Sequence, residues 1–444
     1  MLIRFICENF LSFDKEMEFL NTASSKSENL KEHVYRKDPK HVPILKGAAI
    51  YGANASGKSN FLKAINFSKN IITSPKKNIS DHKISTRQNK FNGGKETKFE
   101  YEFKVDDEIF NYGFVTNWDK VLEEWLYIRS INTTAKEISI FVRKNNELIE
   151  EQKIKKIVTE DKKDKNFFEY CKKSLGEGQL FLHKLKEDNV KFADKILDWF
   201  ERIEFIRPDT KATPFWYFSS EEYREFAQSV ISRLDSNISK ICYNDFLIKE
   251  PTDIKDVPSQ IAEDMFDNLT KKENAVIVFK GWVLVKEKGQ IKQKEIQIER
   301  NGKRFALSEE SRGINRLFDL IPFLFNIKTK NKIFLIDEIE TSLHPHIART
   351  LIEMFFEFSK DNESQLIFAT HDCNLMDLDL MRKDEIWLIQ RDKEMDTKIT
   401  SLAEYKIRDD LVIEKGYLQG RFGAIPFIGD WKKIGLKNAK KKTK

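Results

Sequence analysis

The sequence has little of what stabilises small secreted or metal-stapled domains. Its 444 residues include four cysteines, Cys7, Cys171, Cys242 and Cys373, and no two of them have CxxC spacing. Cysteines this far apart argue against a zinc site and against a disulfide framework, and they favour reduced thiols. The composition therefore indicates a protein of a reducing compartment.

Long apolar runs are also missing. No stretch approaches the roughly 20 apolar residues that a membrane span needs. The apolar run at the start is interrupted by Glu8, before a signal-peptide core could form. We therefore expect a cytoplasmic chain without membrane contact.

An excess of one charge is missing too. The 77 basic and 71 acidic residues leave a net charge of +6, which is not the strongly positive field of a simple nucleic-acid coat. A hydrophobic content of 40% and an aromatic content of 12% argue against wholesale disorder. We find no internal repeat and no long heptad stretch, so a coiled-coil arm is not expected.

One motif stands out among the residues that are present. Residues 52–59 read GANASGKS and fit the phosphate-loop pattern G-x-x-x-x-G-K-[ST] at every fixed position. The apolar segment 44–51 before it predicts a buried strand, and residues 60–65 after it have helical spacing. Such a loop points backbone N–H groups and a helix N-terminus at phosphates. The predicted ATP-binding residues are Gly52, Asn54, Ala55, Ser56, Gly57, Lys58, Ser59 and Asn60.

Within this loop, Lys58 would reach the β- and γ-phosphates, and Ser59 would supply a hydroxyl ligand to Mg²⁺. A glycine-rich turn that binds no nucleotide is the alternative interpretation.

An acidic pair ends the next informative strand. Residues 333–338 read IFLIDE, and two carboxylates have little reason to end a buried strand unless charge meets them there. In a phosphate-loop ATPase, Asp337 would hold Mg²⁺, and Glu338 would orient and deprotonate the attacking water. Without the phosphate loop, a surface strand end would be the better interpretation.

A histidine follows a further apolar strand, residues 365–372. A lone histidine is usually structural. Its position after the acidic strand favours a role for His371 at the γ-phosphate. The predicted catalytic residues are Glu338, His371 and Lys58.

The alternation of apolar and polar residues, together with the distribution of charge, divides the rest of the chain into segments. Residues 1–20 predict a strand pair, and residues 99–142 predict an antiparallel meander. Helical segments at 192–203 and 221–234 predict an inserted helical subdomain, and strands return at 275–279 and 295–298, joined around Gly289. The resulting division is 1–145 and 273–431 for the two parts of an ATPase core, 146–272 for the helical insert and 432–444 for a basic tail.

Together these motifs resemble ABC-class ATPases, such as those of SMC and DNA-break-repair proteins. Residues 52–59, 337–338, 340–345 and 370–372 are similar to that class's phosphate loop, Walker B, D-loop and switch histidine, and 309–316 sits where it has its signature loop. The resemblance implies an α/β ABC-type P-loop NTPase core, with ATP and Mg²⁺ as cofactors. It also implies a homodimer or higher homo-oligomer in which Ser311 and Gly313 complete the partner's site, near the D-loop residues Ser342 and His344.

Other interpretations remain open for two of these segments. Residues 309–313 could be a helix-start cap, and residues 344–346 fit loop packing better than a pair of metal ligands. Gln88 is the candidate for the class's glutamine loop.

A narrower resemblance rests on residues 9–13 (NFLSF), 382–387 (RKDEIW) and 416–426 (GYLQGRFGAIP). These segments resemble prokaryotic AAA/ABC-type ATPases of abortive infection, of the AbiL and RloA kind, related to the ATPase subunit of the PARIS system. That resemblance implies an ATPase that senses a phage cue and controls a separate effector, such as a TOPRIM-like or other nuclease.

Two other functional classes compete with a defence regulator. A nuclease of the overcoming-lysogenization type would need a C-terminal TOPRIM domain, but only about 70 residues follow His371 and they lack its acidic set. A DNA clamp of repair or a transporter subunit is the other class, weakened by the missing heptads and the altered signature. The basic tail could touch nucleic acid or an acidic partner, although a solvated end is the favoured interpretation.

Overall fold

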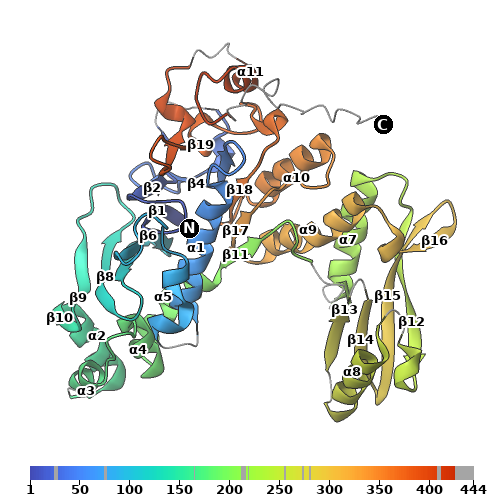
Figure 1. The fold of residues 1–444 in the computed structure, drawn as a ribbon, viewed down its shortest axis with the longest axis horizontal. Coiled ribbons are helices and arrows are strands. Elements are labelled where there is room, and N and C mark those ends of the chain that lie inside the picture. Colours follow the sequence, from blue (N-terminus) through green and yellow to red (C-terminus); the bar gives the residue numbers. More distant parts are fainter. Residues whose placement is uncertain are drawn as a thin grey trace, which may run out of the picture.

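The computed structural model describes most of the chain, in ten stretches: residues 1–24, 29–74, 78–164, 166–211, 217–218, 220–254, 257–272, 275–279, 282–407 and 412–425. They form an α/β structure with three large sheets, of seven, six and five strands (Figure 1). Pro426 and the basic tail, which the sequence singled out, lie outside the described residues.

A mostly parallel sheet lies at the centre. Its strand order is β11-β17-β18-β5-β19-β20, and only the β19–β20 pair is antiparallel. The strands are β11 (Ile203–Ile206), β17 (Ile333–Ile336), β18 (Gln365–Ala369), β5 (Gly47–Tyr51), β19 (Ile386–Arg391) and β20 (Thr397–Ser401). Because β5 comes from the start of the chain and β17 to β20 from its end, both ends of the chain build this sheet.

Helices cover both faces of this sheet. Along β17, Ile333 and Leu335 pack in one apolar cluster with residues of α1 and α5, whereas Phe334 and Ile336 pack in another with residues of α7, α9 and α10. The helices are α1 (Lys58–Thr73), α5 (Lys191–Glu201), α7 (Glu221–Leu234), α9 (Arg312–Thr329) and α10 (Pro345–Phe358). Parallel strands buried on both faces read as continuous apolar runs, and this explains the composition of β17 and β18.

The expected strand pair and meander form one antiparallel sheet of seven strands, in the order β10-β9-β8-β7-β6-β1-β2. The strands are β10 (Glu147–Glu150), β9 (Ile138–Lys144), β8 (Val121–Ser130), β7 (Glu108–Thr116), β6 (Thr97–Val105), β1 (Leu2–Glu8) and β2 (Met17–Leu20). The inner face is aromatic, and the ring of Phe103 stacks on Trp199 of α5 with centroids 4.1 Å apart. This packing joins the sheet to the helices beside β11.

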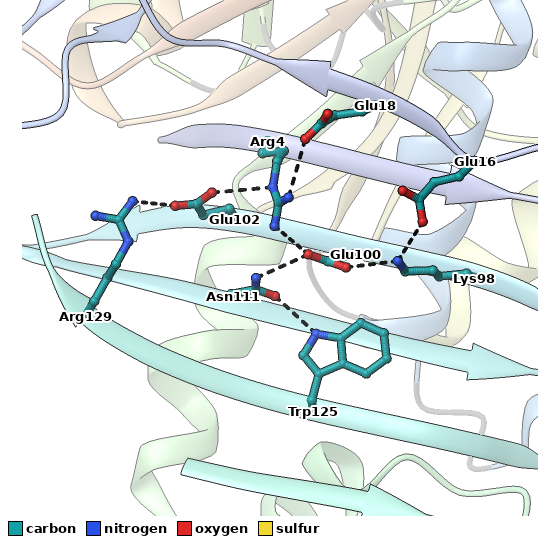
Figure 2. Close-up of polar contacts among 9 residues, drawn as sticks. All are labelled: Arg4, Glu16, Glu18, Lys98, Glu100, Glu102, Asn111, Trp125 and Arg129. Atoms are coloured by element: carbon teal, nitrogen blue, oxygen red, sulfur yellow. Dashed lines mark hydrogen bonds and ion pairs between the residues drawn. The ribbon is translucent and has the colours of Figure 1, made fainter. Parts of the chain in front are cut away.

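The other face of this sheet carries a charged network (Figure 2). Glu100 Oε1 accepts hydrogen bonds from Arg4 Nη2 at 2.6 Å and from Asn111 Nδ2 at 3.2 Å. Arg4 also lies 3.4 Å from Glu18 and 3.5 Å from Glu102. Side chains of β2, β1, β6 and β7 are thereby tied together across the strands.

The segment 146–272 is mixed rather than purely helical. It does contain α2 (Gln152–Lys162), α3 (Phe167–Lys173), α4 (Phe181–Glu187), α5, α7 and α8 (Ser259–Lys271). However, β11 lies within it and pairs in parallel with β17, so the central sheet resumes at Ile203. Strand β12 (Lys240–Ile248) also lies within it and pairs with β15. These strands are short or rich in polar residues, and their partners come from later in the chain.

The third sheet and α8 form a lobe that projects away from the central sheet (Figure 1). Its strands are β12, β15 (Gln290–Arg300), β14 (Trp282–Glu287), β13 (Val276–Phe279) and β16 (Lys303–Ala306). The expected strands at 275–279 and 295–298 are both present, but β14 lies between them, and Gly289, with a φ of 77°, lies in the β14–β15 turn. A small apolar core of its own, including Leu269 and Trp282, holds the lobe together.

The remaining elements are short. Strands β3 (Val34–Tyr35) and β4 (Ile44–Leu45) pair with each other, and α11 (Ile413–Leu418) is the last helix described. The 3-10 turns are Lys31–His33, Ile79–His82, Ile84–Thr86, Pro251–Asp253, Leu307–Glu309, Cys373–Leu375, Lys383–Glu385 and Leu402–Glu404. In the described ranges, every helix falls short of the length or the apolar character that a bilayer crossing requires.

Candidate nucleotide site

The phosphate loop connects β5 to α1. Gly57 has a φ of 120°, and a Cβ added there would lie 2.7 Å from Thr397 Cγ2 and 3.0 Å from Ser12 Oγ. Thr397 Oγ1 also donates a hydrogen bond to Ser56 O at 3.2 Å, so β20 braces the loop from outside. The loop therefore requires glycine at this position for both its backbone angle and its surroundings. Helix α1 begins directly after it, and the N–H groups of its first turn face the loop.

Lys58 folds back over this loop. Its Nζ donates to Gly52 O at 2.7 Å and to Ala53 O at 3.1 Å, and it lies 3.3 Å from His371 Nδ1. Burial lowers the pKa of Lys58 to about 8, although nearby carboxylates, Asp337 foremost, oppose the shift. A cation that loses so much solvation is stabilised by any anion that enters the loop.

Ser59 and Asp337 meet across the sheet. Ser59 Oγ donates a hydrogen bond to Asp337 Oδ1 at 3.0 Å. Burial raises the pKa of Asp337 and the neighbouring charge of Glu338 raises it further, while the hydrogen bond from Ser59 lowers it. A hydroxyl and a carboxylate oxygen side by side are the type of ligand that Mg²⁺ prefers, so this pair fits the predicted metal site.

Glu338 has an unusual backbone conformation. Its φ of 50° lies in the left-handed region, which a residue with a side chain adopts at some energetic cost and which often marks a functional position. Thr341 Oγ1 donates to its carboxylate at 2.9 Å and fixes the side chain. Glu338 lines a cavity of about 490 Å³ together with Asn54, Ala55, Ser56, Gly57, Lys58, Ser59, Asn60, His371 and Arg391.

His371 enters the same cavity from the end of β18. Its backbone N–H donates to Glu340 Oε1 at 2.7 Å, so a carboxylate from the segment after β17 fixes the turn that carries the ring. Burial lowers the pKa of His371, and the charge of Lys58 lowers it further. The structure thus brings together the loop lysine, the acidic pair and the histidine, as the order of the motifs predicts.

The predicted signature residues lie next to the predicted D-loop residues, and neither set lines the phosphate-loop cavity. Ser311 is the N-cap of α9, and its Oγ accepts a hydrogen bond from Ile314 N at 3.3 Å. A Cβ on Gly313 would lie 3.0 Å from Ser342 O, so the two segments are in contact. His344 is the N-cap of α10 and accepts a hydrogen bond from His346 N at 3.2 Å. The helix-start cap that we considered for residues 309–313 is therefore present at Ser311, and His344 also caps a helix.

These residues do not reach the phosphate-loop cavity of their own chain. Among the described residues that line the cavity, none is Ser311, Gly313, Ser342 or His344. The cap geometry leaves a helix N-terminus at Ser311, which is exposed.

The sequence interpretation missed Arg391. It ends β19, which pairs in parallel with the phosphate-loop strand β5, and its side chain lines the cavity. The signal was present, because Arg391 follows a buried apolar run in the same way as Asp337 and His371 do. Gln88, in contrast, is held in its own loop: its Nε2 donates to Lys95 O at 2.6 Å, and it lines a neighbouring cavity.

The C-terminal motif, described up to residue 425, packs against β19 and β5. Gln390 Oε1 accepts a hydrogen bond from Ala424 N at 3.1 Å, and Tyr417 OH donates to Ala424 O at 3.0 Å. The ring of Tyr417 lies 6.2 Å from that of Tyr51 at the end of β5. This motif therefore supports the two strands whose ends carry the phosphate loop and Arg391.

A parallel sheet with a glycine loop after one strand and an acidic pair after another defines a P-loop ATPase of the AAA/ABC type. Residues 48–377 match the family model described as "AAA domain, putative AbiEii toxin, Type IV TA system", and the chain belongs to this family. No curated protein matches the chain.

Several solved structures are similar in outline. They include the SMC head domain from Thermotoga maritima, with 14% identity and a TM-score of 0.39 over 90% of this chain and 98% of that one. An SmcHead bound to the C-winged helix domain of ScpA has 16% identity and a TM-score of 0.40, covering 90% and 97% of the two chains. A Smc head from Pyrococcus furiosus, with an extended coiled coil and bound to the C-terminal domain of ScpA, has 14% identity and a TM-score of 0.37, covering 95% and 98%.

Proposed function

We propose that this protein binds ATP with Mg²⁺ and hydrolyses it. The observation that carries the proposal is the 3.0 Å hydrogen bond between Ser59 and Asp337, which joins the phosphate loop to the end of the acidic strand, next to the cavity that Ser59 and Glu338 line. Lys58 and His371 both line this cavity, and Lys58 Nζ lies 3.3 Å from His371 Nδ1. A lysine, a hydroxyl, two carboxylates and a histidine around a helix N-terminus are the groups that phosphoryl chemistry requires.

Each side chain has a distinct role in this proposal. The loop amides and Lys58 bind the phosphates, and Ser59 and Asp337 hold Mg²⁺, which neutralises developing charge when bound. Glu338 orients the attacking water and accepts its proton. His371 donates to the γ-phosphate from a turn that Glu340 fixes. Hydrogen bonds to Asp337, Glu338 and the turn of His371 hold these groups in place, which favours catalysis by positioning.

We also propose that two copies share their ATP sites. Ser311 and Gly313 lie at an exposed helix start next to Ser342 and outside the cavity of their own chain. Placed against the γ-phosphate of a second copy, the N-terminus of α9 would meet negative charge. ATP would then bridge the two copies in a homodimer or a higher homo-oligomer, and hydrolysis would release them.

In the cell, we infer a cytoplasmic ATPase that acts as sensor and regulator in anti-phage defence by abortive infection. The family description, which names an AbiEii toxin and a type IV toxin–antitoxin system, supports this inference. The ATPase would control a separately encoded effector, which would be TOPRIM-like or another nuclease. The alternative is a nucleotide-gated DNA-binding ATPase of repair, or a nuclease of the overcoming-lysogenization type.

ATP affinity tests the site directly. We expect the wild type to bind ATP more tightly with Mg²⁺ than without it, Asp337→Asn to lose most of this gain, and Lys58→Ala to lose binding under both conditions. Wild-type affinity in Lys58→Ala would contradict the proposal. Phage challenge of cells that carry the gene with its neighbours separates defence from repair: protection lost in Glu338→Gln supports defence, whereas DNA-damage sensitivity without lost protection supports repair.

A further inference from the structure

A second cavity adjoins the phosphate-loop cavity. It has a volume of about 290 Å³, and the two cavities share Asn60 and Arg391. The remaining lining residues are Leu11, Ser12, Thr86, Gln88, Asn89, Lys90, Phe91 and Met395. Because Asn60 lies on the first turn of α1, a molecule whose phosphates occupy the loop can extend past this residue into the second cavity.

Apolar side chains line this cavity although they face solvent. Phe91 is 75% exposed, the highest value among the large hydrophobic residues of the described ranges, and Met395 is 47% exposed. Exposed aromatic surface of this kind often marks a binding site. Arg391 adds a planar cation that can stack on an aromatic ring and also attract phosphate.

The loop that carries Phe91 is braced by its own hydrogen bonds. Asn89 Oδ1 accepts from Phe91 N at 2.8 Å, and Asn89 N donates to Asn9 Oδ1 at 3.2 Å. Thus Phe91 is held on an ordered turn despite its exposure. An aromatic side chain has only two side-chain torsions, so it loses little conformational entropy when a flat ligand stacks on it.

Several polar side chains of this cavity are already engaged. Gln88 donates to Lys95 O at 2.6 Å and accepts from Gly94 N at 3.3 Å, and Thr86 Oγ1 donates to Lys83 O. Phe91 offers the cavity a ring face and Met395 a thioether, while Lys90 and Arg391 add positive charge. Stacking of this kind tolerates different bases, because every base has a π-face.

We propose that this second cavity is the base subsite of the nucleotide site, in which Phe91 and Met395 contact a purine ring and Arg391 lies between base and phosphates. The inference rests on the proposed nucleotide-binding function and adds a specificity to it. The base contributes affinity through stacking, and adenine and guanine are accepted with less than about tenfold difference in affinity.

The test uses the full chain and compares ATP, GTP and inorganic tripolyphosphate in the presence of Mg²⁺. We expect Phe91→Ala to weaken ATP and GTP by about tenfold or more and to leave tripolyphosphate unchanged. Phe91→Trp should restore the affinity for both nucleotides. Trp118→Ala is the matched control, because Trp118 is 62% exposed and does not line either cavity.

The outcomes separate the two proposals. Unchanged ATP affinity in Phe91→Ala overturns the base subsite, and so does an equal loss for tripolyphosphate, which would indicate a general disturbance of the site. A preference for one of ATP and GTP over the other that exceeds about tenfold overturns recognition by stacking. If the wild type binds none of the three compounds, the nucleotide-binding function itself fails.

Discussion

Ser59 Oγ lies 3.0 Å from Asp337 Oδ1, although 278 positions separate the two residues in the chain. The contact exists because β5 and β17 flank β18 in the central sheet, so their carboxyl ends meet at one edge. Ligands of open α/β sheets bind at this edge. The same edge receives His371 from β18 and Arg391 from β19.

The lowered pKa of Lys58 predicts a pH dependence of ATP binding. In the free protein, Lys58 loses its proton around pH 8, whereas bound phosphates keep it charged to higher pH. Affinity should therefore be nearly full at about pH 7, be halved near pH 8 and fall by roughly tenfold by about pH 9. Titration of the dissociation constant between about pH 7 and 9.5 measures this.

The control for this titration is Lys58→Arg, whose guanidinium stays charged throughout the range. Its affinity should not decline with pH, whatever its absolute value. A flat wild-type profile would contradict the combination of a lowered pKa of Lys58 and its contact with the phosphates.

If two copies share their ATP sites, two variants that are each inactive should regain ATP turnover when they are mixed. Lys58→Ala disables the phosphate loop and Ser311→Arg disables the signature surface, so each variant alone should be inactive. In a mixed dimer, the intact loop of one copy faces the intact signature of the other, and random mixing restores about a quarter of the wild-type sites. ATP turnover of an equimolar mixture measures this recovery.

The matched control mixes Lys58→Ala with Glu338→Gln. Both changes affect the same side of the site, so every mixed site keeps one defect and no turnover should appear. Absence of recovery in the Ser311→Arg mixture as well would argue for sites completed within one chain.

Gly57 is expected to tolerate no side chain. Gly57→Ala would push a methyl group against Thr397 and Ser12 and would strain a backbone with a φ of 120°, so ATP affinity should fall by at least about tenfold. Gly302→Ala is the control: its φ of 75° is also left-handed, but nothing lies within 4 Å and the turn belongs to the lobe. Equal ATP affinities in the two variants would contradict the interpretation that the surroundings of Gly57 exclude a side chain.

The charged face of the seven-stranded sheet makes a prediction about stability. Glu100→Ala removes the acceptor of Arg4 and Asn111, so the free energy of unfolding should fall by about 1–3 kcal/mol. The exposed pair of Glu123 and Lys144, 2.9 Å apart, is the comparison, and Glu123→Ala should cost less than about 1 kcal/mol. Urea denaturation of both variants measures the difference, and equal midpoints would show that the network contributes nothing special.

Short sequence motifs predicted those parts of the site that are encoded by a few neighbouring residues. The phosphate loop, the acidic pair and His371 each follow an apolar run, and the α/β class follows from their order. The four residues Ile203–Ile206 gave no comparable signal, because the strand is short and its partner β17 lies far along the chain. Arg391 also follows an apolar run, but only the pairing of β19 with β5 shows that the end of this run lies beside the phosphate loop.

The central claim is that Glu338 activates water in a site built from both ends of the chain, and ATP turnover of Glu338→Gln against the wild type tests it most directly. Glutamine keeps the shape and can still accept from Thr341, but it cannot take the proton. We expect Glu338→Gln to bind ATP as the wild type does while turnover falls by at least about a hundredfold. Turnover at the wild-type rate would contradict the account and leave the protein a nucleotide-binding scaffold.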